Sequence, residues 1–125
     1  IRIPAARGVG TRVELRCPDP AANPYLVLAA CLEAGLDGIR NQITPPDAVT
    51  ENVFEMQLQQ RAKLGIESLP GDLEQAVEEL EKDDYIKNVL GGHITEKYLE
   101  AKRAEWADYR AQVTEWEIEK YLYKI

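Results

Sequence analysis

Arginine, glutamate and arginine alternate at positions 12, 14 and 16, within the stretch TRVELR (11–16). In an extended backbone, alternate side chains share one face and lie about 6.5 to 7 Å apart. Arg12, Glu14 and Arg16 would then form a charged row, and the residues between them would face a core. The alternation and the β-branched residues predict a short β-strand with one charged face.

This charged row suits the chemistry of nucleotides and metals. A carboxylate surrounded by cations stays ionised, and a hard cation such as Mg²⁺ binds carboxylate oxygens together with substrate phosphates. Neighbouring guanidinium groups can clamp phosphate or carboxylate oxygens and neutralise charge during phosphoryl transfer. The alternative is an exposed strand whose ion pairs contribute about 0 to 1 kcal/mol. The spacing alone does not decide between these readings.

Charge is unevenly distributed along the 125 residues. Arg2, Arg7, Arg12 and Arg16 with Glu14 give residues 1–16 a net charge of +3, whereas the whole chain carries −7, which leaves −10 for the rest. An acidic chain is poorly suited to nucleic acid or an anionic membrane surface. The basic N-terminal segment, by contrast, suits a small anion.

Composition narrows the class of protein further. A chain of this length with 45% hydrophobic residues suits one domain. No apolar run reaches the ~18 to 20 residues of a membrane span, and no signal peptide is visible. Cys17, Cys31 and His93 cannot form a four-ligand zinc site. We expect the cysteines to be small buried residues and the protein to be cytoplasmic. A strand-like run begins directly at Ile1, so we expect a fragment of a longer protein.

Most of the chain reads as helix. Asn23-Pro24 predicts a cap and first helical position for a helix over 25–39, which is apolar nearly all round and therefore expected to be buried. A loop at 41–52 and a less regular region through Gly65 follow. Pro70-Gly71-Asp72 predicts the start of another helix, with apolar residues at i, i+4 and i+7.

The C-terminal part continues the helical pattern. A short helix is predicted over 84–90, with its stop at Gly91-Gly92. The last helix is predicted from about Thr95 to Val113 or beyond, with Leu99, Trp106, Tyr109, Val113 and Trp116 on one stripe. Residues 121–125 are apolar and aromatic, and such an end favours a partner surface. The predicted fold class is mainly α, with one or two N-terminal β-strands followed by several helices.

Several spaced motifs together resemble the C-terminal part of bacterial type I glutamine synthetase (glutamate–ammonia ligase), and they cover essentially the whole chain. They are RIPAARG (2–8), TRVELR (11–16), PDPAANPYL (18–26), AGLDGI (34–39), IESLP (66–70), EAKRAEW (100–106) and QVTEWE (112–117).

The resemblance implies a role for each matching residue. Glu14 matches a metal-ligating glutamate that holds Mg²⁺ or Mn²⁺ at the γ-phosphate of ATP. Arg2 and Arg12 match arginines around the ATP phosphates. Arg16 matches a catalytic arginine that contacts the glutamate substrate and the transferring phosphoryl group. Arg7 receives no role and is expected to be a solvent-facing turn residue.

The resemblance also implies an architecture and a reaction. The chain would belong to an α+β catalytic domain, with an active-site strand segment at 1–17, a helical region at 23–113 and an assembly tail at 114–125. Glutamate, ATP and ammonia would give glutamine through γ-glutamyl phosphate, in a dodecamer of two stacked hexamers. The fragment alone would be inactive, because most of the family's metal ligands precede it.

Two alternatives remain open at this stage. The chain could be an independent helical oligomerisation or interaction module, or part of a related ligase that joins glutamate to amines. His93, at the Gly91-Gly92 boundary, is expected to be a surface or capping residue. One departure concerns regulation: where some of these enzymes carry a tyrosine that is adenylylated, this chain has Phe54, which lacks the hydroxyl.

Overall fold

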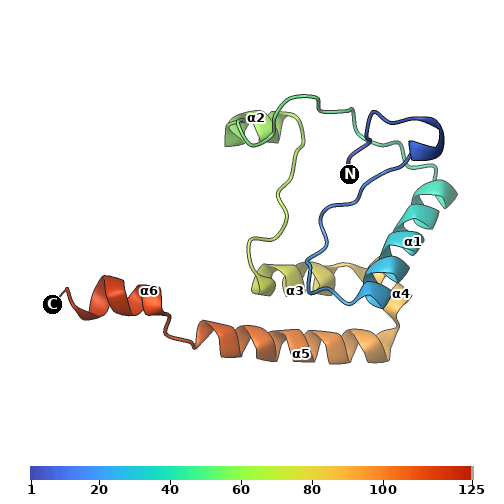
Figure 1. Cartoon of the computed structure of the whole chain (residues 1–125). Coiled ribbons are helices and arrows are strands. Elements are labelled where there is room, and N and C mark those ends of the chain that lie inside the picture. Colours follow the sequence, from blue (N-terminus) through green and yellow to red (C-terminus); the bar gives the residue numbers. More distant parts are fainter. Residues whose placement is uncertain (125) are drawn as a thin grey trace. The chain divides into compact units, whose positions relative to one another are not determined.

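The computed structural model describes residues 1–124, which divide into two compact units that meet between Leu69 and Pro70. The first unit contains a 3-10 turn and two helices, labelled in Figure 1 where there is room: η1 (Gly8–Gly10), α1 (Pro24–Arg40) and α2 (Leu58–Lys63). The second contains α3 (Leu73–Lys82), α4 (Asp84–Leu90), α5 (Gly92–Arg110), α6 (Glu115–Glu117) and the π-helical turn η2 (Ile118–Leu122). Among the described helices, none combines the length and apolar character of a membrane span.

The prediction of a mainly helical fold is confirmed, but the predicted N-terminal strand is wrong. Residues 1–124 contain no strand, only an isolated antiparallel bridge between Arg2 and Glu14. The Arg2 amide donates to the Glu14 carbonyl at 2.9 Å and the Glu14 amide to the Arg2 carbonyl at 2.8 Å. A strand needs a run of such bonds to a neighbour. Here the intervening chain turns at η1, where Gly8 has φ +68°, and the pairing stops after one residue pair.

Helix α1 begins where the sequence predicts. The Asn23 side chain accepts hydrogen bonds from the amides of Tyr25 and Leu26 at 3.0 and 3.4 Å, and Pro24 occupies the first helical position. The expected burial is wrong, since Leu28 and Leu32 are 68% and 64% exposed. A helix that is apolar nearly all round needs cover on every side, and the first unit offers α1 little. Cys17 and Cys31, also expected to be buried, are exposed.

The second unit is built from α3, α4 and α5, with α3 lying along α5 (Figure 1). The predicted spacing on α3 is confirmed, because Val77 is buried and Leu80 is half-buried. Glu81 of α3 pairs with Arg103 of α5. Polar groups also fasten the turn between α4 and α5, where the Thr95 hydroxyl donates to the Lys87 carbonyl at 3.2 Å.

The turn at the end of α4 is set by glycine, as predicted. Gly91 adopts φ +79°, a conformation that strains residues carrying a Cβ, and α4 ends one residue before it. Gly92 then begins α5, and His93 lies exposed in its first turn. The glycine pair therefore ends one helix and begins the next.

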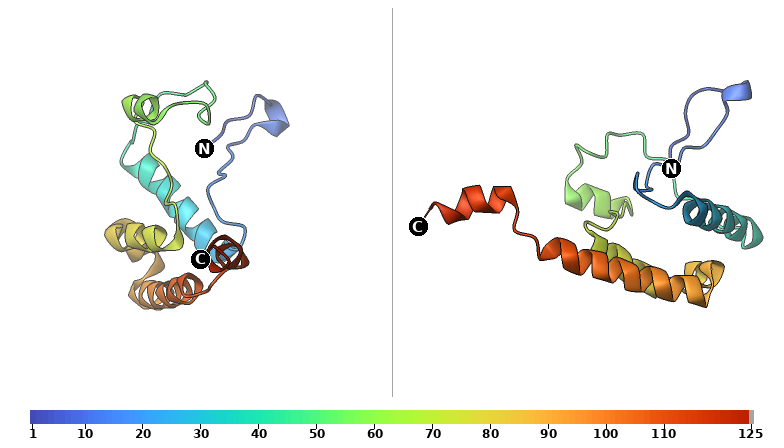
Figure 2. Two further views of the ribbon diagram at one scale, coloured as in Figure 1. Left: turned by 90° about the vertical axis from the view of Figure 1, so that its left-hand side faces the viewer. Right: turned by 60° about the horizontal axis from the view of Figure 1, so that its bottom comes forward.

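Helix α5 ends at Arg110, earlier than predicted, because the following residues form a separate capped turn. The Thr114 hydroxyl accepts from the Glu117 amide at 3.2 Å, and the Glu117 carboxylate accepts from the Thr114 amide at 2.8 Å. Trp116 consequently leaves the α5 stripe and packs edge-to-face on Tyr121, with ring centroids 5.9 Å apart. Figure 2 shows this C-terminal segment continuing beyond α5; it contacts no other described helix.

We predict that Asp72→Ala destabilises the second unit by about 1 kcal/mol, because the Asp72 carboxylate caps α3 by accepting from the Gln75 amide at 2.8 Å. Urea unfolding followed by circular dichroism measures the change. Asp47→Ala, which removes the same charge from an exposed loop residue, is the control. Equal stability of the two variants would contradict the capping role.

Candidate functional site

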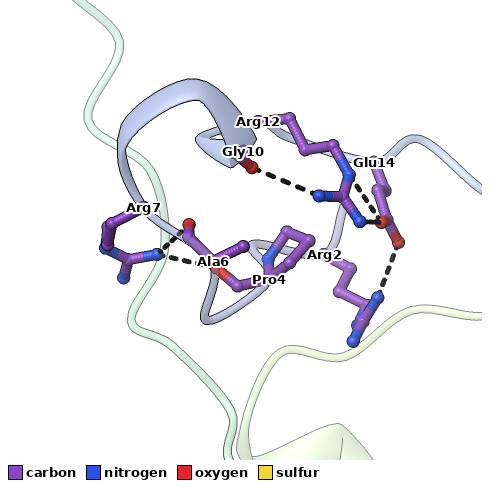
Figure 3. Close-up of polar contacts among 7 residues, drawn as sticks. All are labelled: Arg2, Pro4, Ala6, Arg7, Gly10, Arg12 and Glu14. Atoms are coloured by element: carbon purple, nitrogen blue, oxygen red, sulfur yellow. Dashed lines mark hydrogen bonds and ion pairs between the residues drawn. The ribbon is translucent and has the colours of Figure 1, made fainter.

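The Arg2–Glu14 bridge brings together two segments that lie twelve residues apart in the chain. Figure 3 shows the intervening residues folded into a loop, with the Arg2 and Arg12 side chains approaching Glu14 from two directions. Pro4, within this loop, is buried. The backbone therefore fixes which cations meet the Glu14 carboxylate.

Both carboxylate oxygens of Glu14 accept hydrogen bonds from arginine. Oε2 accepts from Arg2 Nη1 at 2.8 Å, and Oε1 accepts from Arg12 Nε and Nη2 at 3.0 and 2.7 Å (Figure 3). The Glu14 side chain is 22% exposed, while those of Arg2 and Arg12 are 55% and 52% exposed. The long side chains of Arg2 and Arg12 thus shield the carboxylate, while the arginines themselves face solvent.

The arginines lower the pKa of Glu14 below its ordinary value. The largest cause is the hydrogen bond from Arg2, followed by that from Arg12, and the charges of Arg2 and Arg16 add to them, while partial desolvation acts in the opposite direction. Arg16 acts on Glu14 only through its charge, since the described residues include no hydrogen bond or ion pair between the two. The structure therefore brings Arg2, Arg12 and Glu14 into contact and leaves Arg16 beside them.

Arg7 supports the loop rather than the carboxylate. Its Nη1 donates to the carbonyls of Pro4 and Ala6 at 2.7 and 3.0 Å (Figure 3). Arg12 makes a similar contact to the Gly10 carbonyl at 3.2 Å. The sequence pattern did not indicate either contact, because a carbonyl acceptor carries no residue-type signal. The twelve-residue separation likewise hid the pairing of Arg2 with Glu14 from an argument based on strand spacing.

The site can supply part of a metal centre. Glu14 offers carboxylate oxygens, the donors that Mg²⁺ and Mn²⁺ prefer. Residues 1–124 contain no group of three or more His, Cys, Asp or Glu side chains placed to hold a metal ion. Glu14 could therefore supply only one of the ligands that such an ion needs. With its arginines, the arrangement suits an anion that carries a divalent cation.

Comparisons with known proteins identify one family. Residues 1–121 match the family model described as "Glutamine synthetase, catalytic domain". Glutamine synthetases of Clostridium saccharobutylicum and Thermotoga maritima are 54% and 55% identical over 124 and 123 residues, covering 99% and 98% of this chain. That of Methanocaldococcus jannaschii is 53% identical over 122 residues. A solved structure titled "Apo GmaS without ligand" aligns with a TM-score of 0.72 and 42% identity.

The matches cover only part of each relative. The chain spans 28% of the first and second of these synthetases and 27% of the third. The alignment with the solved structure covers 86% of this chain and 24% of the solved chain. The described residues thus correspond to one portion of a longer catalytic domain.

We predict that Arg12→Gln raises the pKa of Glu14 toward its ordinary value, because one of the two arginine contacts is lost. Since the folded pKa is depressed, these contacts stabilise the fold above the unfolded pKa, and their contribution is lost as pH falls through the folded pKa. Side-chain carboxyl NMR titration measures the shift. Arg7→Gln, which leaves both Glu14 contacts in place, should leave the titration unchanged. An unchanged Glu14 pKa in Arg12→Gln would contradict this electrostatic assignment.

Proposed function

Because the chain belongs to the glutamine synthetase catalytic-domain family, we propose that it forms one wall of the active site of an ATP-dependent ligase that makes glutamine from glutamate and ammonia. The observation that carries the proposal is the cluster in which Arg2 and Arg12 contact Glu14, on a chain that matches the family over residues 1–121. Since the chain spans about 28% of its relatives, the activity belongs to the longer protein.

Glu14 is the proposed metal ligand. Its carboxylate oxygens and depressed pKa suit a group that must stay ionised beside a cation. Bound Mg²⁺ or Mn²⁺ neutralises charge on the terminal phosphate of ATP. Arg2 and Arg12 reach the same point in space and suit the phosphate oxygens, because guanidinium groups bind them through paired N–H donors.

Arg16 is the proposed catalytic arginine that contacts glutamate. The γ-carboxylate oxygen of glutamate attacks the γ-phosphorus of ATP, and ADP leaves; ammonia then attacks the acyl carbon, loses a proton, and phosphate leaves. Both reactants of the first step are anions that repel each other. Guanidinium groups held beside them lower that repulsion and orient the attack, so the chain contributes positioning and charge stabilisation.

The names of the relatives bear on the acceptor of the reaction. Identities of 53% to 55% to proteins named glutamine synthetase favour ammonia as acceptor over an amine. The cytoplasmic location stays a prediction from cysteine content. The alternative of an independent helical interaction module does not explain why Arg2 and Arg12 both form ion pairs with Glu14.

We also propose that the longer protein assembles as two stacked hexamers and that the segment 114–125 contributes to stacking. Within the described part, Trp116, Tyr121, Leu122 and Tyr123 are between 57% and 79% exposed. Each such side chain contributes about 1.5 to 3 kcal/mol when fully buried. A partner subunit would supply that burial.

We predict that the longer protein forms glutamine, that residues 1–125 alone do not, and that Glu14→Gln in the longer protein weakens Mn²⁺ binding by about 10- to 100-fold or more. The amide is isosteric but lacks the charge that holds the cation. Coupled measurement of glutamine and ADP checks activity, and Mn²⁺ titration checks binding. Glu119→Gln, a matched change outside the cluster, should preserve both. Glutamine formation by residues 1–125 alone, or undiminished Mn²⁺ affinity in Glu14→Gln, would refute the proposal.

Deletion of residues 117–125 from the longer protein should weaken the stacking of rings, because it removes three of the four exposed aromatic and leucine side chains of the tail. Light scattering should report particles of about half the mass. Glu119→Gln, which keeps those side chains, should retain the full mass. A full-mass assembly after the deletion would show that the tail does not hold the rings together.

A further inference from the structure

Arginine and a divalent cation would compete for the same carboxylate oxygens of Glu14. Arg2 engages Oε2 at 2.8 Å, and Arg12 engages Oε1 through two donors at 2.7 and 3.0 Å. A divalent cation binds the same oxygens of a carboxylate. The three arginine donors occupy three of the roughly four acceptor directions of the carboxylate. A cation that binds through both oxygens therefore has to displace at least one arginine contact.

We propose that Glu14 exchanges partners: a divalent cation displaces arginine from the carboxylate, and the released guanidinium groups of Arg2 and Arg12 become the phosphate-binding groups of the nucleotide. This inference rests on the proposed function, and concerns how its two ligands are coupled. Each ion pair acts as a latch that keeps a phosphate-binding group on Glu14 until a cation takes its place.

The local structure permits such an exchange. Arg2 and Arg12 are 55% and 52% exposed, so their side chains can swing without opening a packed core. The backbone bridge between Arg2 and Glu14 does not involve their side chains, so it keeps the two residues side by side throughout. Ion pairs made by such solvent-exposed arginines are also weak, and a divalent cation can replace them.

The exchange makes cation and nucleotide assist each other. A cation on Glu14 frees the arginines for phosphate, and phosphate on the arginines frees Glu14 for the cation. By thermodynamic linkage, each ligand must raise the affinity of the other by the same factor. Part of this coupling comes from the latch, beyond the direct attraction between cation and phosphate.

Arg7 provides the matched control. It carries the same charge on the same loop, but its guanidinium binds the carbonyls of Pro4 and Ala6 instead of Glu14. Arg7→Gln and Arg12→Gln therefore remove equal charge, and only the second opens the latch. Arg12→Lys keeps the charge and removes the two-donor contact to Oε1.

The experiment uses the full-length protein and measures Mn²⁺ binding from the electron paramagnetic resonance signal of free Mn²⁺, with and without ADP. We expect Arg12→Gln to bind Mn²⁺ alone about two- to fivefold more tightly than Arg7→Gln does, which is the value of an exposed ion pair. Arg12→Lys should lie between wild type and Arg12→Gln. The factor by which ADP tightens Mn²⁺ binding should fall in both Arg12 variants and stay at the wild-type value in Arg7→Gln.

Equal Mn²⁺ affinity and equal ADP enhancement in Arg12→Gln and Arg7→Gln would overturn the exchange. Wild-type Mn²⁺ affinity in Arg12→Lys would also overturn it, since charge rather than the contact would then account for any effect of Arg12→Gln. Glu14→Gln distinguishes the proposed function from the proposed exchange. If this variant loses Mn²⁺ binding while the Arg12 variants show no exchange, the proposed function stands. If it binds Mn²⁺ as wild type does, the metal role fails and the exchange with it.

Discussion

The grip of two guanidinium groups on one carboxylate is the interaction on which the proposed site depends. Arg12 reaches Glu14 from two residues away, whereas Arg2 reaches it across a loop and a backbone bridge. Exposed ion pairs of this kind add little to stability. In the proposed site, their role is to hold three charged groups together where a cation and a phosphate would bind.

The two units differ in the interactions that stabilise them. The second unit is stabilised by helix caps and contacts between helices: Asp72 caps α3, Gly91 forms the turn between α4 and α5, and Val77 is buried. In the first unit, large apolar side chains such as Leu28 and Leu32 remain exposed on α1. Burial of such side chains is a main stabilising term in folding.

Local chemistry was readable from the sequence, and long-range contacts were not. The cap at Asn23 and the start of a helix at Pro70-Gly71-Asp72 were predicted because such signals depend on residues only two or three positions away. The early end of α5 was missed, although Thr114 and Glu117 carry the spacing of a capping box. The strand at 11–16 was wrong because a strand exists only through its neighbour. The charged cluster was anticipated in its residues, but not in the contact between Arg2 and Glu14.

Anomalous diffraction from crystals of the full-length protein with Mn²⁺ and a non-hydrolysable ATP analogue tests the central claim most directly. The account predicts a manganese peak about 2.0 to 2.6 Å from a Glu14 oxygen, with the Arg2 and Arg12 guanidinium groups moved from the carboxylate to the phosphates. A manganese peak bound elsewhere, with Glu14 still held by both arginines, would contradict it.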